Sequence, residues 1–281
     1  MNSLTLGLIA ALCWGFHDIC VRAISQKTPL MAMLLTVLLS GLGFHLILMG
    51  VTGEFAMIST TAMIYAGLAG VFFLIASLGL YTAFERGPVR LVAPIIGAYP
   101  VLSIGWATVQ GTPITVLQIA AVAAIITGVG IVAALADDSS DDVPPIGPTI
   151  VYSVIAAIGF AGTFALGQHA AEISHDMPAT LVTRVVATTA LIGIMAIKGL
   201  PFLVGWKPLP VLVLMGIADG IALLSVVSAG TLANPEYAAV TSSIFGLITI
   251  VLAWIFLREL MGPAQWLGCA IAFGGIGYLA L

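Results

Sequence analysis

Ten apolar stretches, each about as long as a membrane-spanning helix, take up almost the whole chain. A helix needs about 20 apolar residues to cross the hydrocarbon core of a bilayer. Charged residues make up only 7% of the sequence, whereas a soluble domain carries about 25%. The sequence therefore predicts an all-α, multi-pass membrane protein with ten transmembrane helices. Their expected positions are residues 3–24, 30–50, 60–83, 89–109, 113–135, 147–170, 178–197, 209–233, 236–257 and 261–281. The short connections predict that consecutive helices pack as antiparallel neighbours.

The chain divides into two similar units. Residues 137–146 form an acidic and proline-containing linker that separates residues 1–136 from residues 147–281. Each unit holds five of the apolar stretches. A shift of 147 positions brings Pro88 onto Pro235, Gln118 onto Gln265, Gly128 onto Gly275 and Gly130 onto Gly277. An odd number of spans inserts the second copy in the opposite direction. We therefore expect two inverted five-helix repeats, with a solute site between them near the middle of the membrane.

Five ionisable side chains lie well inside predicted spans: His17, Asp18, His45, Arg184 and Asp219. Such a group costs a few kcal/mol to insert at the bilayer centre, so each is a functional candidate. Asp219 and Arg184 could form a structural ion pair between two helices, or they could line a solute or proton site. His17 and Asp18 are adjacent on one helix and diverge by about 100°. We therefore expect that they do not point along one line into a cavity.

Three aromatic residues join this group. Trp14 precedes His17 by three residues and Asp18 by four, so it shares a helix face with either of them. Tyr81 and Tyr99 could contact a solute, and a buried phenol needs a hydrogen-bond partner. Ordinary packing is the alternative for each. The expected solute-binding or coupling residues are Asp219, Asp18, His17, Arg184, Trp14, Tyr99 and Tyr81.

Two kinds of residue are candidates for gating. Pro94 and Pro100 interrupt the hydrogen-bond ladder of the fourth span and permit a kink, which serves either gating or simple curvature. Charged residues at loop entrances form either a gate of ion pairs or a solvated surface. These are Glu85, Arg86, Arg258 and Glu259.

Several short motifs are typical of one family of carriers. They are Trp14-Gly15-Phe16, the run 80–94 with Tyr99-Pro100 after it, Arg258-Glu259-Leu260 with Gln265, and the glycine-rich run 274–277. In this order and spacing the sequence resembles the EamA-type branch of the drug/metabolite transporter superfamily over nearly its whole length. The resemblance implies a ten-helix metabolite carrier. The chain departs from it at Thr112, where the counterpart of Glu259 is expected, and at Ile158-Gly159-Phe160, so the two halves have specialised.

These observations favour a secondary carrier that works by alternating access. Two aspartates and one arginine inside the spans suit amino acids or similar zwitterions, and the excess of acid makes organic amines or drug-like cations the alternative. An intramembrane enzyme would need a convergent motif that the sequence lacks, so no catalytic residue is expected. No Walker A, metal or cofactor motif is present in the sequence. We expect a monomer or homodimer in the lipid bilayer, driven by protons or by the solute's own gradient, and with 8 basic residues no affinity for nucleic acid.

The distribution of basic residues predicts the orientation. Seven of them, Arg22, Lys27, Arg86, Arg90, Lys198, Lys207 and Arg258, lie at one end of the spans, and the loops at the other end contain none. The positive-inside rule then places both termini outside the cytoplasm. The family resemblance implies the opposite, with both termini in the cytoplasm. The expected location is the plasma membrane, which in a bacterium is the inner membrane.

Overall fold

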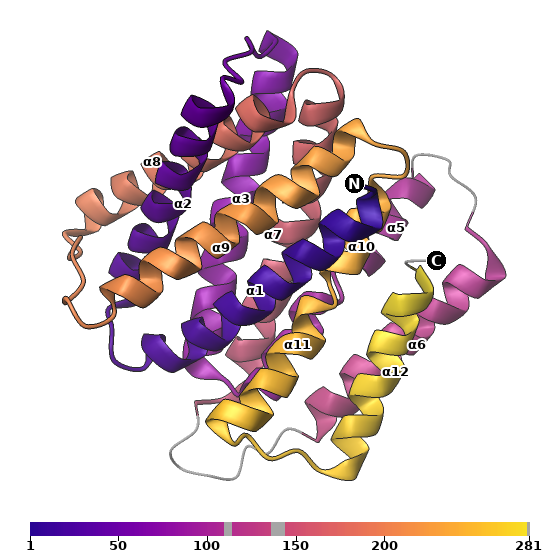
Figure 1. The fold of residues 1–281 in the computed structure, drawn as a ribbon. Coiled ribbons are helices and arrows are strands. Elements are labelled where there is room, and N and C mark those ends of the chain that lie inside the picture. Colours follow the sequence, from indigo (N-terminus) through magenta and orange to yellow (C-terminus); the bar gives the residue numbers. More distant parts are fainter. Residues whose placement is uncertain (110–113, 136–143, 280–281) are drawn as a thin grey trace.

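The computed structural model describes residues 1–109, 114–135 and 144–279, and all regular structure in these ranges is helical (Figure 1). The first half contains α1 (Ser3–Ser25), α2 (Leu30–Thr52), α3 (Thr60–Arg86), α4 (Val89–Gly97), α5 (Pro100–Val109) and α6 (Val116–Ala134). The second half contains α7 (Ile146–Glu172), α8 (Asp176–Lys198), α9 (Leu209–Ser228), η1 (Ala229–Thr231), α10 (Glu236–Ser242), α11 (Phe245–Leu252), η2 (Ala253–Leu257) and α12 (Pro263–Leu279). Of the predicted linker, residues 137–143 lie outside the described ranges.

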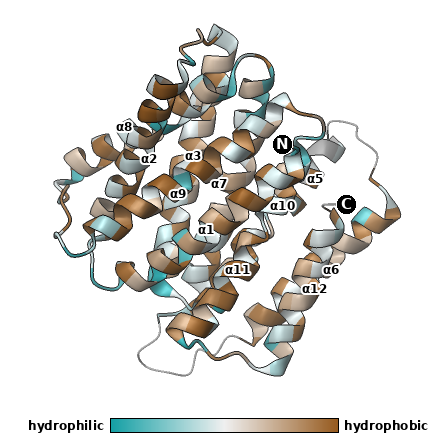
Figure 2. Cartoon of the chain, viewed as in Figure 1, coloured by the Kyte–Doolittle hydropathy of each residue, from teal (hydrophilic) through white to brown (hydrophobic). Residues whose placement is uncertain are grey.

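Eight helical stretches in the described ranges are long and apolar enough to cross a membrane. The fourth predicted span is instead the α4–α5 pair, whose apolar part is the shorter stretch Val89–Leu102. The last predicted span coincides with α12, which has 17 described residues. A multi-pass helical protein is therefore confirmed, whereas the count of ten is not. Most of the helices are rich in hydrophobic residues (Figure 2). Many large apolar side chains are exposed, such as Ile47 at 70%, as expected for a surface in contact with lipid.

The most extensive packing joins the two halves. Helix α3 packs on α7 and α8, α9 packs on α1 and α2, and α6 packs on α12. Consecutive helices such as α7 and α8 or α8 and α9 are also in contact, as predicted, but they pack less extensively than the pairs between the halves, and α1 and α2 barely touch. Helices in lipid associate where small residues let their backbones approach, and here those residues face the other half. Gly79 lies against the α7 backbone at Tyr152, and Gly216 lies against the α2 backbone at Val37.

The α6–α12 contact carries the internal symmetry of the sequence. Gly128 of α6 lies against the backbone of Gly268 in α12. The residues that correspond to this pair under the shift of 147 positions make the same contact in reverse, and a Cβ added at Gly275 would come within 2.7 Å of the Ala121 carbonyl oxygen. The duplication is therefore visible as a two-fold related helix pair, which stands at one side of the bundle (Figure 1).

Two interrupted helices cross at their interruptions. Pro100 has no N–H to donate, so the chain between α4 and α5 tightens into i−3 hydrogen bonds, including Tyr99 N–H to the Ile96 carbonyl at 3.2 Å. The α10–α11 junction shows the same pattern without a proline. There Ser242 and Ser243 donate their hydroxyls to the carbonyls three residues before them, which competes with helix geometry. The Tyr99 hydroxyl joins the two junctions by hydrogen bonds to Ala239 O and Ser242 Oγ.

Candidate functional site

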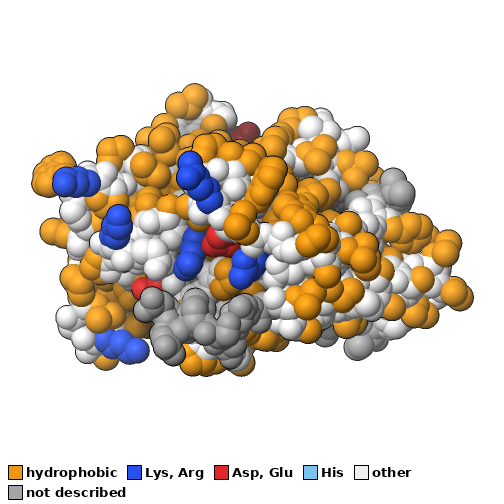
Figure 3. All heavy atoms as spheres, turned by 90° about the horizontal axis from the view of Figure 1, so that it is seen from below, with side chains coloured by type: hydrophobic (Ala, Val, Ile, Leu, Met, Phe, Trp, Pro, Cys, Tyr) orange, Lys and Arg blue, Asp and Glu red, His pale blue; other side chains and the backbone are white. Residues whose placement is uncertain are grey.

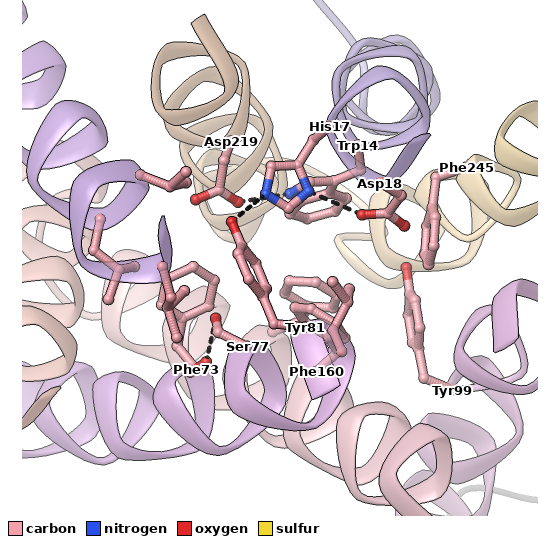
Figure 4. A pocket seen from close by; sticks show the side chains of 15 residues that line it. Trp14, His17, Asp18, Phe73, Ser77, Tyr81, Tyr99, Phe160, Asp219 and Phe245 are labelled. Carbon is pink, nitrogen blue, oxygen red and sulfur yellow. Dashed lines mark hydrogen bonds and ion pairs between the residues drawn. The ribbon is translucent and has the colours of Figure 1, made fainter. Parts of the chain in front are cut away.

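A small buried cavity lies between the two halves, at the level of the helix interruptions (Figure 4). The space available to the centre of a water-sized sphere is about 20 Å³, and a single water needs about 10–15 Å³ on this measure. The structure is therefore a closed conformation, too small inside for a metabolite. The lining residues are Trp14, His17, Asp18, Leu34, Val37, Leu38, Phe73, Ser77, Leu80, Tyr81, Tyr99, Phe160, Phe164, Asp219 and Phe245.

Six of the seven expected solute-site residues line this cavity, and the seventh, Arg184, lies directly behind it. Arg184 on α8 is fully buried and pairs with Asp219 on α9, with 2.6 Å between Nη1 and Oδ2. Trp14 Nε1 donates a hydrogen bond of 2.9 Å to the other oxygen, Oδ1. The guanidinium carbon of Arg184 also lies 5.0 Å from the ring centroid of Phe73. Asp219 is therefore in an ion pair and also faces the cavity.

His17 is held by both of its ring nitrogens. Nδ1 shares a hydrogen bond of 2.9 Å with Asp18 Oδ1, and Nε2 shares one of 3.0 Å with the Tyr81 hydroxyl on α3. The second oxygen of Asp18, Oδ2, is buried and has no hydrogen-bond partner among the described residues. Figure 4 shows the imidazole between Asp219 and Asp18, directly above Tyr81.

Both adjacent residues of α1 line the cavity, although their side chains leave the helix in different directions. The cavity extends around α1, from Asp219 on α9 to Phe245 on α11. A space that follows the helix surface over this angle reaches two side chains that diverge by about 100°. The helical spacing fixes the two directions, and only the three-dimensional structure shows that the cavity reaches both.

An aromatic cluster forms one wall of the cavity. Trp14 stacks on Phe164 with 5.3 Å between ring centroids, Phe160 stacks on Phe164 at 5.7 Å, and Tyr99 meets Phe164 edge-on at 5.2 Å. Sequence reasoning missed Phe160 and Phe164, because a phenylalanine in an apolar span is ordinary. Their spacing of four residues, which places both on one face of α7, was the available signal.

An ion-pair cluster closes the end of the molecule that carries the basic residues. Arg22, near the end of α1, donates to the carbonyls of Phe84 and Glu85 at 2.9 and 3.1 Å. Its Nε lies 3.6 Å from Glu259 Oε1, and the Arg90 N–H donates to Glu259 Oε2 at 3.4 Å. Burial raises the pKa of Glu259 above its ordinary value despite these two arginines. We call the group formed by Arg22, Glu259, the Arg90 N–H and the carbonyls of Phe84 and Glu85 the ionic latch. Figure 3 shows basic side chains around an acidic one at this end.

The expected gating residues take different places around this latch. Glu259 belongs to it, and Glu85 contributes its backbone carbonyl. Arg86 instead reaches the Pro145 carbonyl at 3.5 Å. Arg258 is exposed, has a left-handed backbone with φ of 54°, and forms no ion pair within the described part of the chain. Pro100 opens α5 at the helix interruption, and Pro94 lies within α4.

Neutral contacts close the opposite end. Gln168, near the end of α7, donates its amide to the carbonyls of Val226 and Pro235 at 3.0 and 2.9 Å. The Ser3 hydroxyl donates to the Ala233 carbonyl at 2.8 Å. Arg22 thus joins α1 to the other half at one end of the molecule, and Ser3 joins α1 to the other half at the opposite end, whereas Gln168 bonds within the second half.

Comparison with known proteins agrees with this architecture. The EamA-like transporter family matches residues 1–134 and, a second time, residues 147–281. No curated protein sequence matches the chain. Among solved structures, 29 chains match, and one of these, a protein crystal structure, superposes with a TM-score of 0.73 at 16% sequence identity, over 99% of this chain and 98% of that chain. A likeness at this identity shows a shared fold. The family resemblance inferred from the sequence motifs is therefore confirmed: the chain belongs to the EamA-like transporter family and is a multi-pass membrane transporter.

Proposed function

We propose that this transporter carries small organic solutes that bear a positively charged amino group, by alternating access around the central cavity. The observation that supports this class is the charge of the lining. Asp18 presents a carboxylate oxygen without a partner, whereas Arg184 is already neutralised by Asp219. Aromatic rings next to a free carboxylate are a favourable environment for an ammonium group, because their faces attract cations.

Alternating access requires that one end opens while the other stays closed. Both ends are closed here, one by the ionic latch and the other by the Ser3 contact with the Ala233 carbonyl. The crossing of the two helix interruptions, at Tyr99 and Ser242, lies beside the cavity. Pro94 and Pro100 weaken the helix ladder there, so bending at this crossing would let α5 and α11 move without unfolding. In this scheme the latch is a gate, and the solute's own gradient or a proton gradient drives the cycle.

Amino acids and similar zwitterions remain a second candidate for one structural reason. The Arg184 Nε and Nη2 atoms are buried and have no hydrogen-bond partner among the described residues. A solute carboxylate that reached them, past Phe73, would find two unused donors. This would need a larger cavity than the closed one, since Arg184 does not line it.

A matched series of solutes separates these candidates. Phenethylamine, phenylalanine and 3-phenylpropionate share a ring and differ only in their charged groups. Each would compete for binding to purified protein and for uptake into proteoliposomes. The cation proposal expects the amine to bind best, by at least tenfold over the acid. Preference for phenylalanine would favour the zwitterion candidate, and preference for 3-phenylpropionate would contradict both.

The proposed orientation has both termini outside the cytoplasm of a plasma membrane, on the strength of the seven basic residues at the latch end. A cysteine introduced at Arg258, which is exposed at that end, would react with an impermeant thiol reagent only from the cytoplasmic side. Reaction from outside intact cells would reverse the orientation and leave the cavity argument unchanged.

A further inference from the structure

The His17 contacts have a property that the rest of the cavity lacks. When it is ionised, the Asp18 carboxylate only accepts hydrogen bonds, whereas a tyrosine hydroxyl both donates and accepts. At Nδ1, His17 therefore has a partner that only accepts a hydrogen bond, and at Nε2 it has a partner that can either donate or accept. This arrangement satisfies the imidazole in two protonation states without moving any heavy atom.

In the neutral state, His17 Nδ1–H donates to Asp18 and Nε2 accepts from the Tyr81 hydroxyl. In the protonated state both ring N–H groups donate, and the Tyr81 oxygen becomes an acceptor. The step adds one proton at His17 Nε2, and the Tyr81 O–H hydrogen turns from the imidazole toward the cavity. Tyr81 thus shows the cavity a lone pair when His17 is neutral and a hydrogen when His17 is charged.

The charges that face His17 come from four elements. Asp18 lies on α1 with the uncharged thiols of Cys13 and Cys20, Tyr81 lies on α3, and Asp219 on α9 is balanced by Arg184 on α8. From α2, α7 and α11 only uncharged side chains line the cavity. With neutral His17 the set carries one net negative charge, that of Asp18. With protonated His17 it carries none.

From this geometry we propose that His17 binds the proton that this transporter exchanges for its cationic solute. The direction of the Tyr81 O–H then changes with the protonation state of His17, and the solute contacts that hydroxyl. One proton and one monovalent ammonium group compensate the same charge of Asp18. The neutral state offers the ammonium group the free Asp18 oxygen and the Tyr81 lone pair. The protonated state removes both attractions. The inference rests on the proposed cation specificity and adds a one-for-one proton antiport.

Proton release on solute binding is the direct test. Phenethylamine is added to purified protein in weakly buffered detergent with a pH-indicator dye, and binding is measured in parallel from pH 6 to pH 9. We expect up to about one proton released per amine bound, and a dissociation constant that rises by up to about tenfold for each unit by which the pH is lowered, because binding linkage is reciprocal.

Two variants separate His17 from other buried groups. In His17→Gln, which keeps a polar side chain, we expect amine binding without proton release and without this pH dependence. His45→Gln is the matched control, because His45 is also buried but donates Nε2 to the Gly220 carbonyl at 2.9 Å and does not line the cavity. It should keep the wild-type pH profile. Proton release that persists in His17→Gln would overturn the proposal.

A spectroscopic measurement decides the matter if His17→Gln does not fold. The chain has 4 histidines, of which His169 and His175 are exposed, so ¹⁵N-histidine spectra of His45→Gln contain one buried imidazole. Saturating amine should convert it from imidazolium to the neutral form, and an unchanged signal would overturn the proposal. Amine flux without proton release would remove this inference alone. Absence of amine binding and flux in the wild type would instead remove the proposed function.

Discussion

Arg22 on α1 and Glu259 in the loop before α12 approach to 3.6 Å across the boundary between the two halves. Their side chains are 23% and 15% exposed, so the pair is neither a solvated surface contact nor a dry one. Arg22 also donates to two backbone carbonyls of the α3–α4 junction. Within the latch, the Arg22 side chain contacts both halves, by hydrogen bonds to the first and by charge to the second. A substitution at Arg22 is therefore the most direct test of the latch.

Arg22→Gln should open the latch end. The change removes charge-assisted hydrogen bonds to two carbonyls and leaves Glu259 partly buried without its cation, at a cost of about 1–2 kcal/mol to the closed state. We expect about a 5–30-fold faster reaction of a Ser77→Cys cavity residue with an impermeant thiol reagent, in a background with Cys13, Cys20 and Cys269 changed to alanine. Lys27→Gln, an exposed basic residue at the same end, is the control. Equal rates in both variants would show that the latch does not hold the end closed.

Glu259 should make the folded state less stable as the pH rises through the acid range. Burial raises its pKa above the ordinary value of 4.5, so the folded state binds this proton more tightly than the unfolded state does. The stabilisation is complete below about pH 4.5 and is lost as the pH passes through the raised pKa. We expect the melting temperature of Glu259→Gln to lack this decline. Glu54→Gln, an exposed carboxylate, should decline as the wild type does; a wild-type profile for Glu259→Gln would contradict the assignment.

The Tyr99 and Ser242 hydroxyls should be energetically coupled. They share a hydrogen bond of 2.6 Å, and both also reach the Ala239 carbonyl. Tyr99→Phe and Ser242→Ala should each cost about 1 kcal/mol of folding stability. Because one contact is common to both, the double variant should cost less than the sum. Thermal unfolding in detergent measures the three values, and strict additivity would show that the crossing of the interrupted helices is not held by these groups.

Arg258→Gly should stabilise the protein. Arg258 ends η2 in a left-handed conformation with φ of 54°, and the next N–H, of Glu259, returns to the Ala253 carbonyl at 3.3 Å. Glycine is the preferred residue at such a C-terminal position, because a side chain there costs about 1 kcal/mol. Arg258→Ala keeps the strain and serves as the comparison. A higher melting temperature for alanine than for glycine would contradict the backbone assignment.

Arg184→Gln should prevent folding unless Asp219 is also neutralised. Removal of the arginine leaves a buried carboxylate without a counter-ion, which costs about 3–5 kcal/mol. In Arg184→Gln with Asp219→Asn that charge is absent, and Trp14 can still donate to the asparagine oxygen. Size-exclusion profiles of fluorescent fusions should show little monodisperse Arg184→Gln protein and a recovered peak for the double variant. Recovery without the second change would mean that the ion pair is dispensable.

Much of this fold follows from residues whose meaning does not depend on tertiary structure. Lipid requires long apolar helices, so the membrane spans could be predicted from the sequence. A charged group such as Asp219 at mid-span had to meet a partner or a cavity. The proline interruption at Pro100 was visible for the same reason. The interruption at Ser242 was not, because paired serines in an apolar span are common and only their carbonyl contacts show the break.

Contacts between the halves could not be predicted. Arg22 and Glu259 are far apart in sequence, and nothing local indicates that one lies above the other; Arg22 was identified only as part of a charge count. The shared role of Phe160 and Phe164 depends in the same way on where α7 packs. Sequence patterns describe the surface that each helix offers. Which helix packs on that surface depends on the fit of small residues, such as Gly79 of α3 against α7. This fit is visible only in the three-dimensional structure.

The reversed pair of contacts between Gly128 and Gly268, and between Gly275 and Ala121, means that the α6–α12 pair offers the same backbone contact toward both ends of the molecule. In the proposed alternating-access cycle, this pair would favour opening toward neither face. In that cycle, a preference would come from positions at which the two ends differ, such as Arg22 and Glu259 at one end and Ser3 at the other. A handful of polar substitutions could therefore reverse the resting orientation of the carrier while every helix keeps its place.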